Sequence, residues 1–220
     1  MRMSLSESAP RSPVRERILS TATALFDAYG VRAVGVDRII AESGVAKATL
    51  YAHFRSKDEL VLTCLQQADH NRRDYLRQMA RAAGEDPRDQ LLGVFDALRT
   101  ITVREGFRGC AFVNTAGEMM PGTAPHTATA EHKRAVRTWL TELAAAAGAA
   151  DPELLALQFS VLVDGTLAAA SLHPGPAVAE AAREAARTLI EQSCPARRAK
   201  GPRAKGPRTD GPGADGPGAG

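Results

Sequence analysis

The stretch VGVDRIIAESGVAKATLYAHFRSKDEL, from Val34 to Leu60, decides the fold of this 220-residue chain. Its pattern predicts two short helices, at about 37–43 and 47–54. Gly44 stands between them and supplies the positive φ that a tight turn requires. Two short helices joined through a glycine are typical of a helix-turn-helix.

The two short helices have different inner and outer faces. A short second helix with a polar outer face suits a recognition helix, which lies in the major groove of duplex DNA. A helical hairpin packed against another element explains the apolar positions equally well, but gives no reason for the outward Tyr, His and Lys. The inner face consists of Ile39, Ile40, Ala41, Val45, Leu50 and Phe54. The outer face and the start of the second helix hold Lys47, Ala48, Thr49, Tyr51 and His53.

Helical periodicity continues along the chain, and we predict an all-α fold without strands. Three helices form a helix-turn-helix domain at 14–60, and further helices form a second domain at 61–194. Ser56-x-x-Glu59 is a capping box that starts a long helix. Two further helix starts are predicted at Asp86-Pro87 and Asp151-Pro152. A short helix is predicted near 109–120.

The two ends differ in composition from the rest. Residues 1–13 are rich in Ser and Pro and predict a mobile arm, whereas the Gly- and Pro-rich residues 195–220 predict a disordered tail. The tail holds six Lys or Arg and two Asp or Glu, so the other residues contain 22 basic and 23 acidic ones. DNA binding therefore has to be argued from a motif, because the bulk charge does not support it. A chromosome-associated protein that binds DNA through the tail is an alternative.

Composition limits the remaining classes of protein. No apolar run reaches the ~18 residues of a membrane span, and the N-terminus lacks a signal peptide. We therefore expect a cytoplasmic protein without membrane contact or cofactor. We expect no metal site either, since His126, Glu131 and His132 lack the spacing of metal ligands. The three cysteines are too few and too scattered for a disulfide framework. We expect Cys64 in the core and Cys194 exposed beside the tail.

Residues from about Arg15 to Leu65 resemble the DNA-binding domain of the TetR family of bacterial regulators. The hallmark of that domain is Thr-Leu-Tyr-x-His-Phe with a following Lys, which corresponds here to Thr49, Leu50, Tyr51, His53, Phe54 and Lys57. The resemblance implies a homodimeric, ligand-responsive transcriptional regulator, most often a repressor. It implies that Tyr51, His53 and Lys57 hold phosphates, that Lys47, Ala48 and Thr49 touch bases, and that Arg38 reaches the backbone or a base edge.

Two positions depart from the family pattern. Val36 stands where Thr is common, and Ala46 stands where Ser or a similar cap is common. Each loss removes a side-chain cap worth ~1 kcal/mol. We expect Asp37 to take over the first cap.

The second half of the chain predicts dimerisation. Residues 154–172 are apolar nearly all round, which suggests burial both within the subunit and against a partner. With 178–192 they resemble the intersubunit four-helix bundle of the family, so we expect a homodimer through 154–192. A dimer places two recognition helices on a palindromic operator. The alternative is the central helix of a monomer.

The second half also has candidate effector residues. Arg108-Gly109-Cys110-x-x-x-Asn114 resembles a branch of the family in which this helix lines the ligand cavity. Cys110, Asn114 and Glu118 follow at i, i+4 and i+8, one helical stripe. Cys110 is a candidate sensor of oxidants or electrophiles, a buried core thiol, or the nucleophile of a small enzyme, although no base accompanies it. An unknown small-molecule effector is expected in an apolar pocket walled by Phe95, Phe112, Trp139 and Phe159, unless these aromatics are only core.

Overall fold

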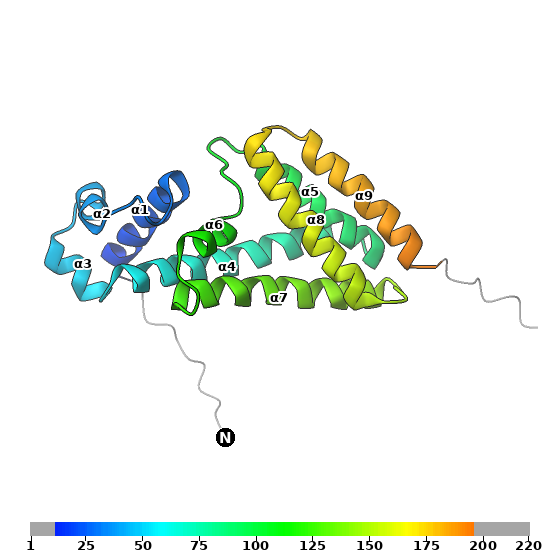
Figure 1. The fold of residues 1–220 in the computed structure, drawn as a ribbon, viewed down its shortest axis with the longest axis horizontal. Helices are drawn as coiled ribbons and strands as arrows, with labels where there is room; N and C mark the ends of the chain where they lie inside the picture. The colour runs from blue at the N-terminus through cyan, green and yellow to red at the C-terminus, as the bar shows by residue number, and fades with distance from the viewer. Residues whose placement is uncertain (1–11, 196–220) are drawn as a thin grey trace, which may run out of the picture.

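The structure, a computed structural model, describes residues 12–195, and nearly all of the expected arm and tail lies outside these residues. Over this range the chain forms nine α-helices and no strand, which confirms the all-α prediction (Figure 1). Helices α1 to α3 lie at one end, α5 to α9 form the larger body, and α4 runs from one into the other. The bounds are α1 Pro13–Tyr29, α2 Val36–Ser43, α3 Lys47–His53, α4 Lys57–Ala82, α5 Pro87–Thr102, α6 Ala111–Glu118, α7 Ala124–Ala146, α8 Pro152–Leu172 and α9 Ala177–Ser193.

Helices α1 to α3 share one apolar core with the first turns of α4. Ile18, Ile39 and Phe54 are almost fully buried in it. Cys64 of α4 belongs to the same core, as expected, and its burial raises the pKa of the thiol to about 11. The domain boundary expected after residue 60 therefore falls within α4, a continuous helix that contributes side chains to both cores.

Side-chain caps start α4, α5 and α8, where the sequence predicted them. The Ser56 hydroxyl accepts the Glu59 backbone N–H at 3.1 Å, and the Glu59 carboxylate accepts the Arg55 N–H at 2.8 Å. Asp86 and Asp151 cap α5 and α8 through their carboxylates. Each cap satisfies a backbone donor at the helix start and contributes about 1 kcal/mol.

The expected cap at Asp37 is wrong. Helix α2 begins one residue earlier than predicted, with Gly35 at its N-cap and no side-chain cap. Asp37 therefore already lies within the first helical turn, where its carboxylate cannot serve as the N-cap acceptor. It is instead 3.5 Å from Lys47 Nζ at the start of α3. Ala46 caps α3 without a side-chain hydrogen bond, as its residue type requires.

The larger body is built on the contact of α5 with α4. A Cβ atom at Gly93 would lie 2.7 Å from the Cβ of Ala83 and 3.0 Å from the Cα of Ala80. The backbones of the two helices thus approach more closely there than any side chain allows. Behind this contact, the rings of Phe95 on α5 and Phe159 on α8 meet edge to face, with centroids 5.5 Å apart.

The expectation that Cys194 is exposed is wrong, because the chain stays folded past the end of α9. Cys194 is 1% exposed and lies in the large core beside Ile190. The Arg88 guanidinium donates to the Pro195 carbonyl at 2.9 Å, and the Ala150 N–H donates to the Ser193 carbonyl at 2.9 Å. These bonds hold the end of the described chain against the body.

The expectation that no apolar segment is as long as a membrane span is wrong for α8. Helix α8 is the one described helix whose length and composition would suffice to cross a membrane, with a mean hydropathy of 1.5. That test alone is weak evidence, because core helices also pass it. Helix α8 packs against α7 and α9, and its Asp164 pairs with Lys133 of α7. These contacts are those of a core helix.

The close approach at Gly93 generates the first prediction. Gly93→Ala gains helix propensity, yet its methyl group meets backbone atoms that cannot move independently. We expect a net loss of about 1–3 kcal/mol in the free energy of unfolding, measured by urea denaturation. Gly117→Ala in α6 is the matched control, because a Cβ there meets nothing within 4 Å, and it should leave stability unchanged or raised by up to about 1 kcal/mol. Equal effects of the two substitutions would contradict the prediction.

Candidate nucleic-acid interface and ligand cavity

A tight turn sets the angle between α2 and α3. Gly44 has φ +64° and ψ 32°, the left-handed conformation, and its N–H donates to the Ile40 carbonyl at 3.1 Å. The N–H groups of Thr49 and Leu50 then bond to the Ala46 carbonyl, which starts α3. Leu50 is buried, so it fixes which side of α3 faces the core.

The opposite side of α3 is open to solvent. Lys47, Ala48 and Tyr51 are exposed, the last at 43%, while Thr49 and His53 are half-buried. The two residues on which the helix-turn-helix interpretation most depends, Tyr51 and His53, thus avoid the core. The structure brings these five together on one short helix, in the arrangement that the sequence predicted.

Arg38 lies on α2 and is held by two neighbours. Its Nε atom is 2.8 Å from Glu42 Oε1, and its guanidinium lies 4.0 Å above the centre of the Tyr29 ring. Both contacts favour the charged form and raise the pKa of Arg38, chiefly through the hydrogen bond to Glu42. Tyr29 is 51% exposed and was not singled out from the sequence, where it reads only as an apolar position of α1. It orients Arg38.

Lys57 is the first residue of α4, so it lies outside α3. Its Nζ atom donates to the Val31 carbonyl at 2.6 Å, and partial burial lowers the pKa of its ammonium group. An ammonium group has three donors, so two remain for other acceptors. A phosphate contact for Lys57 stays a prediction.

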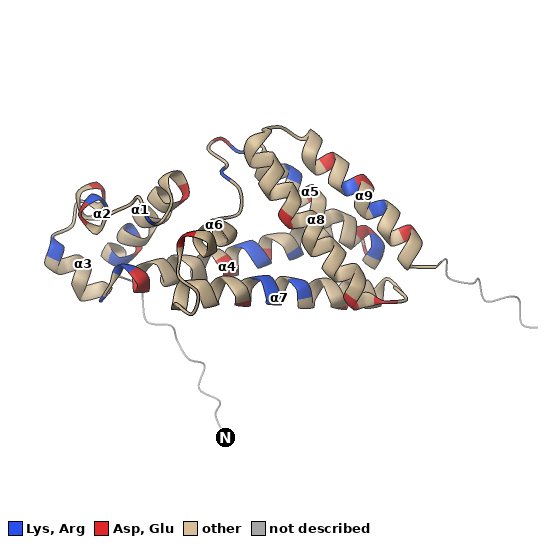
Figure 2. Cartoon of the chain, viewed as in Figure 1, with Lys and Arg blue, Asp and Glu red and all other residues tan. Residues whose placement is uncertain are grey.

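Charges of both signs are mixed over the described chain. Figure 2 shows Lys and Arg dispersed among Asp and Glu along the ribbon. Residues 13–60 contain seven Lys or Arg and six Asp or Glu. Long-range attraction to DNA is therefore weak, and recognition has to come from the particular groups on α3 and α2.

The loop between α1 and α2 is held from the larger body. Glu118, at the end of α6, accepts the backbone N–H of Arg32 at 2.6 Å. Gly30 has φ +84°, and a Cβ atom on it would lie 2.5 Å from Glu118 Oε1. Val31 is buried in a small cluster with Phe112 of α6 and two residues of α4. Helix α6 thus contacts the α1–α2 loop directly.

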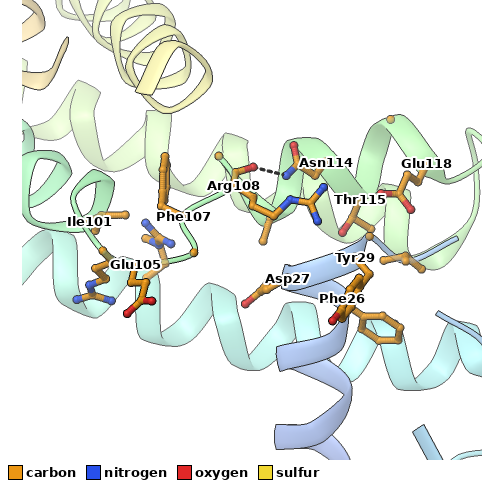
Figure 3. A pocket seen from close by; sticks show the side chains of 18 residues that line it. Phe26, Asp27, Tyr29, Ile101, Glu105, Phe107, Arg108, Asn114, Thr115 and Glu118 are labelled. Carbon is orange, nitrogen blue, oxygen red and sulfur yellow. Dashed lines mark hydrogen bonds between the residues drawn. The ribbon is translucent and has the colours of Figure 1, made fainter. Parts of the chain in front are cut away.

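A polar hollow of about 600 Å³ lies beside this contact, between α1, α4 and the segment from α5 to α6. Figure 3 shows Asp27, Glu105, Arg108, Asn114 and Glu118 around it. The Asn114 amide donates to the Arg108 backbone carbonyl at 2.8 Å. This bond fixes the Asn114 side chain and the backbone at Arg108. Burial raises the pKa of the Asp27 carboxyl group.

A second, more apolar cavity of about 460 Å³ lies among α4, α5, α6, α7 and α8. Cys110 and Phe112 line it, as the sequence predicted for effector residues. The Phe112 ring stacks on His132 with centroids 3.6 Å apart, and His132 Nδ1 is 2.7 Å from an oxygen of Asp69. Burial lowers the pKa of His132.

The other effector candidates lie elsewhere. Asn114 and Glu118 line the polar hollow, so the predicted stripe is divided between two cavities. Phe95 and Phe159 are fully buried in the core, and Trp139 packs against it, but none of the three lines the apolar cavity. They are core, the alternative left open from the sequence. Arg72 and Lys133 also line the apolar cavity. They were not predicted from the sequence, because the spacing of polar residues on α4 and α7 does not distinguish them.

Comparison with known proteins gives consistent matches. Residues 18–64 match the family model described as bacterial regulatory proteins, tetR family. The chain is 38% identical over 88 residues to the HTH-type transcriptional activator FasR of Mycolicibacterium smegmatis, and 35% identical over 89 residues to the HTH-type transcriptional regulator LmrA of Bacillus subtilis. Each match covers 40% of this chain, but only 40% and 45% of those proteins, less than half their length.

A similarity over nearly the whole described chain comes from a solved structure. A TetR-family transcriptional regulator from Streptomyces coelicolor is 34% identical to this chain, with a TM-score of 0.78. The match covers 83% of this chain and 96% of that one, and so includes the larger body as well as the helix-turn-helix.

The Glu118 contact generates the second prediction. Glu118→Ala removes the acceptor of the Arg32 N–H, so that amide should exchange with solvent about ten-fold or more faster, as expected for a hydrogen bond to a charged group. Hydrogen exchange followed by NMR measures it. Glu105→Ala in the same hollow is the control, since no hydrogen bond joins its side chain to the described residues. An unchanged Arg32 amide would show that the contact does not persist in solution.

Proposed function

This chain belongs to the TetR family of transcriptional regulators, and from that membership we propose that it is a homodimeric repressor released from a palindromic operator by a small molecule. TetR-family regulators bind DNA through a helix-turn-helix and are not enzymes, so Cys110 as a catalytic nucleophile is discarded. The single observation that supports the proposal most is the outer face of α3, which presents Lys47, Tyr51 and His53 away from the core.

We assign the DNA contacts by the chemistry of the groups on this face. Lys47, Ala48 and Thr49 stand at the start of α3, where a recognition helix meets base edges. Tyr51 and His53 offer hydrogen-bond donors to phosphate oxygens. Arg38 already has its guanidinium oriented by Glu42 and Tyr29, which lowers the entropy lost when it binds.

The proposed dimer uses the outward side of α8. Its exposed positions alternate at spacings of three and four residues, as in a coiled-coil seam. Large apolar side chains exposed in this way mark an interaction surface. These positions are Leu154, Leu157, Val161, Gly165, Ala168 and Leu172, and we call them the α8 stripe. A two-fold pair through the α8 stripe and α9 would present two α3 helices to one duplex.

The proposed route from ligand to DNA runs through α6. Phe112 lines the apolar cavity and packs on Val31 of the α1–α2 loop, while Glu118 at the other end of α6 holds the Arg32 N–H. A ligand that displaces Phe112 changes the position of this loop relative to α4. The ligand can lower the population bound to the operator only to the extent that it binds the displaced state more tightly than the operator-bound state. An electrophile in the cavity would also meet the Cys110 thiol.

Operator binding generates the third prediction. Selection from a random duplex library with the full chain should enrich a palindrome, and fluorescence anisotropy then measures affinity for it. Lys47→Ala should weaken binding about ten-fold or more and lower the slope of log K against log salt by about 0.9 if Lys47 neutralises a phosphate. If it contacts a base, affinity should fall with the slope unchanged. Arg99→Ala, on an exposed part of α5, is the control.

Failure to enrich any sequence at low salt would refute the operator proposal. Enrichment of a palindrome with no effect of Lys47→Ala or Tyr51→Phe would instead show that α3 is not the recognition helix. A reporter placed behind the selected palindrome gives the sign of regulation, since the M. smegmatis relative is described as an activator.

The α8 stripe generates the fourth prediction. Val161→Asp places a charge in the centre of the stripe and should convert the dimer into a monomer, measured by sedimentation velocity. The matched control is Val103→Asp, because Val103 is also exposed, at 51% against 66%, but lies between α5 and α6. A wild-type chain that is already a monomer at micromolar concentration would exclude this interface.

A further inference from the structure

The apolar cavity borders a cation that has no partner in the structure. Arg72 of α4 lines both this cavity and the polar hollow of Figure 3. It forms no hydrogen bond or ion pair with any residue in the range 12–195. Burial lowers the pKa of its guanidinium, but a guanidinium stays protonated in proteins. A half-buried positive charge is therefore held at the boundary of the two cavities without an acidic partner among the described residues.

The other charged groups of the cavity wall do have partners or lie in solvent. Lys133 pairs with Asp164, and His132 is hydrogen-bonded to Asp69. Arg137 is exposed at the surface. Asp27 is the carboxylate whose field reaches Arg72, yet it lies beyond ion-pair distance. Arg72 is thus the one cation lining this cavity that is half-buried and has no ion-pair partner among the described residues.

The rest of the wall is mainly apolar. Its volume of about 460 Å³ falls within the range of cavities that take a drug-sized molecule. A neutral apolar occupant would remove water from Arg72 and leave its charge without a counter-ion, which is costly. An anionic group at that end would remove this cost and add charge-assisted hydrogen bonds. The apolar lining residues are Leu76, Leu98, Phe112, Val136, Leu157, Val161, Val163 and Leu167.

We propose that the apolar cavity binds molecules with an apolar body and a single anionic group, and that Arg72 binds the anion. The inference rests on the proposed function only in naming this cavity as the effector site. It identifies a ligand class: compact aromatic or aliphatic acids, sulfonates or phosphates. It excludes cations and neutral apolar compounds as the preferred effectors.

A pair of fluorescent probes tests the proposal on the full chain. 8-Anilinonaphthalene-1-sulfonate and N-phenyl-1-naphthylamine share one ring system and differ in the sulfonate. The measured quantity is the ratio of their affinities, so that general hydrophobicity cancels. Arg72→Met should lower the sulfonate-to-amine affinity ratio about ten-fold or more, because one charge-assisted contact is lost. Arg72→Lys should restore part of it, and Arg99→Met, which is exposed on α5 and outside the cavity, should leave it unchanged.

Two further measurements keep the result decisive. Ser160→Phe places a ring in the cavity and should weaken both probes together, which locates their site. Thermal unfolding of each variant shows that it is folded. An unchanged affinity ratio in Arg72→Met, or sulfonate binding that survives Ser160→Phe, overturns the proposal. Operator affinity is measured in parallel: a chain that selects no DNA refutes the regulator, whereas the probe ratio is measured without DNA and tests the ligand class alone.

Discussion

The α1–α2 loop is the point on which the arrangement of the described helices depends, because α4 and α6 hold it through three different interactions. The Lys57 ammonium bonds to the Val31 carbonyl, the Glu118 carboxylate bonds to the Arg32 N–H, and the Val31 side chain is buried against Phe112. Each contact comes from α4 or α6. A three-helix unit with its own core could otherwise pivot on α4. These contacts couple the position of that unit to the position of α6, and therefore to the cavity that α6 lines.

Electrostatics in this chain act locally. The helix-turn-helix has nearly balanced charge, so its useful cations are individually positioned by Glu42, Tyr29 and Asp37. In the larger body most charged groups within reach of the apolar cavity are neutralised in pairs. Against this background the half-buried, unpaired guanidinium of Arg72 is conspicuous, since even partial removal of a charge from water without a partner lowers stability. Structures tolerate such a cost where a ligand removes it.

Local signals in the sequence were enough to predict the helices, because each has its own start and apolar period. Ser56, Asp86 and Asp151 act within one turn, and all three cap as predicted. Asp37 and Cys194 were predicted wrongly since their surroundings depend on neighbours: the first on where α2 begins, the second on how the chain end folds back. The outer face of α3 was predictable from its motif. The pairing state of Arg72 was not, because it depends on side chains from helices far apart in the chain.

The α8 stripe has a consequence for how the chain would respond in a cell. Leu157, Val161 and Gly165 belong to the stripe and also line the apolar cavity, so one helix wall serves both. Subunit pairing and cavity occupancy then share the same side chains, and each must alter the free energy of the other. The dose of effector needed for half-maximal response would depend on how many copies of the chain are made. Gene dosage would set the sensitivity of the response.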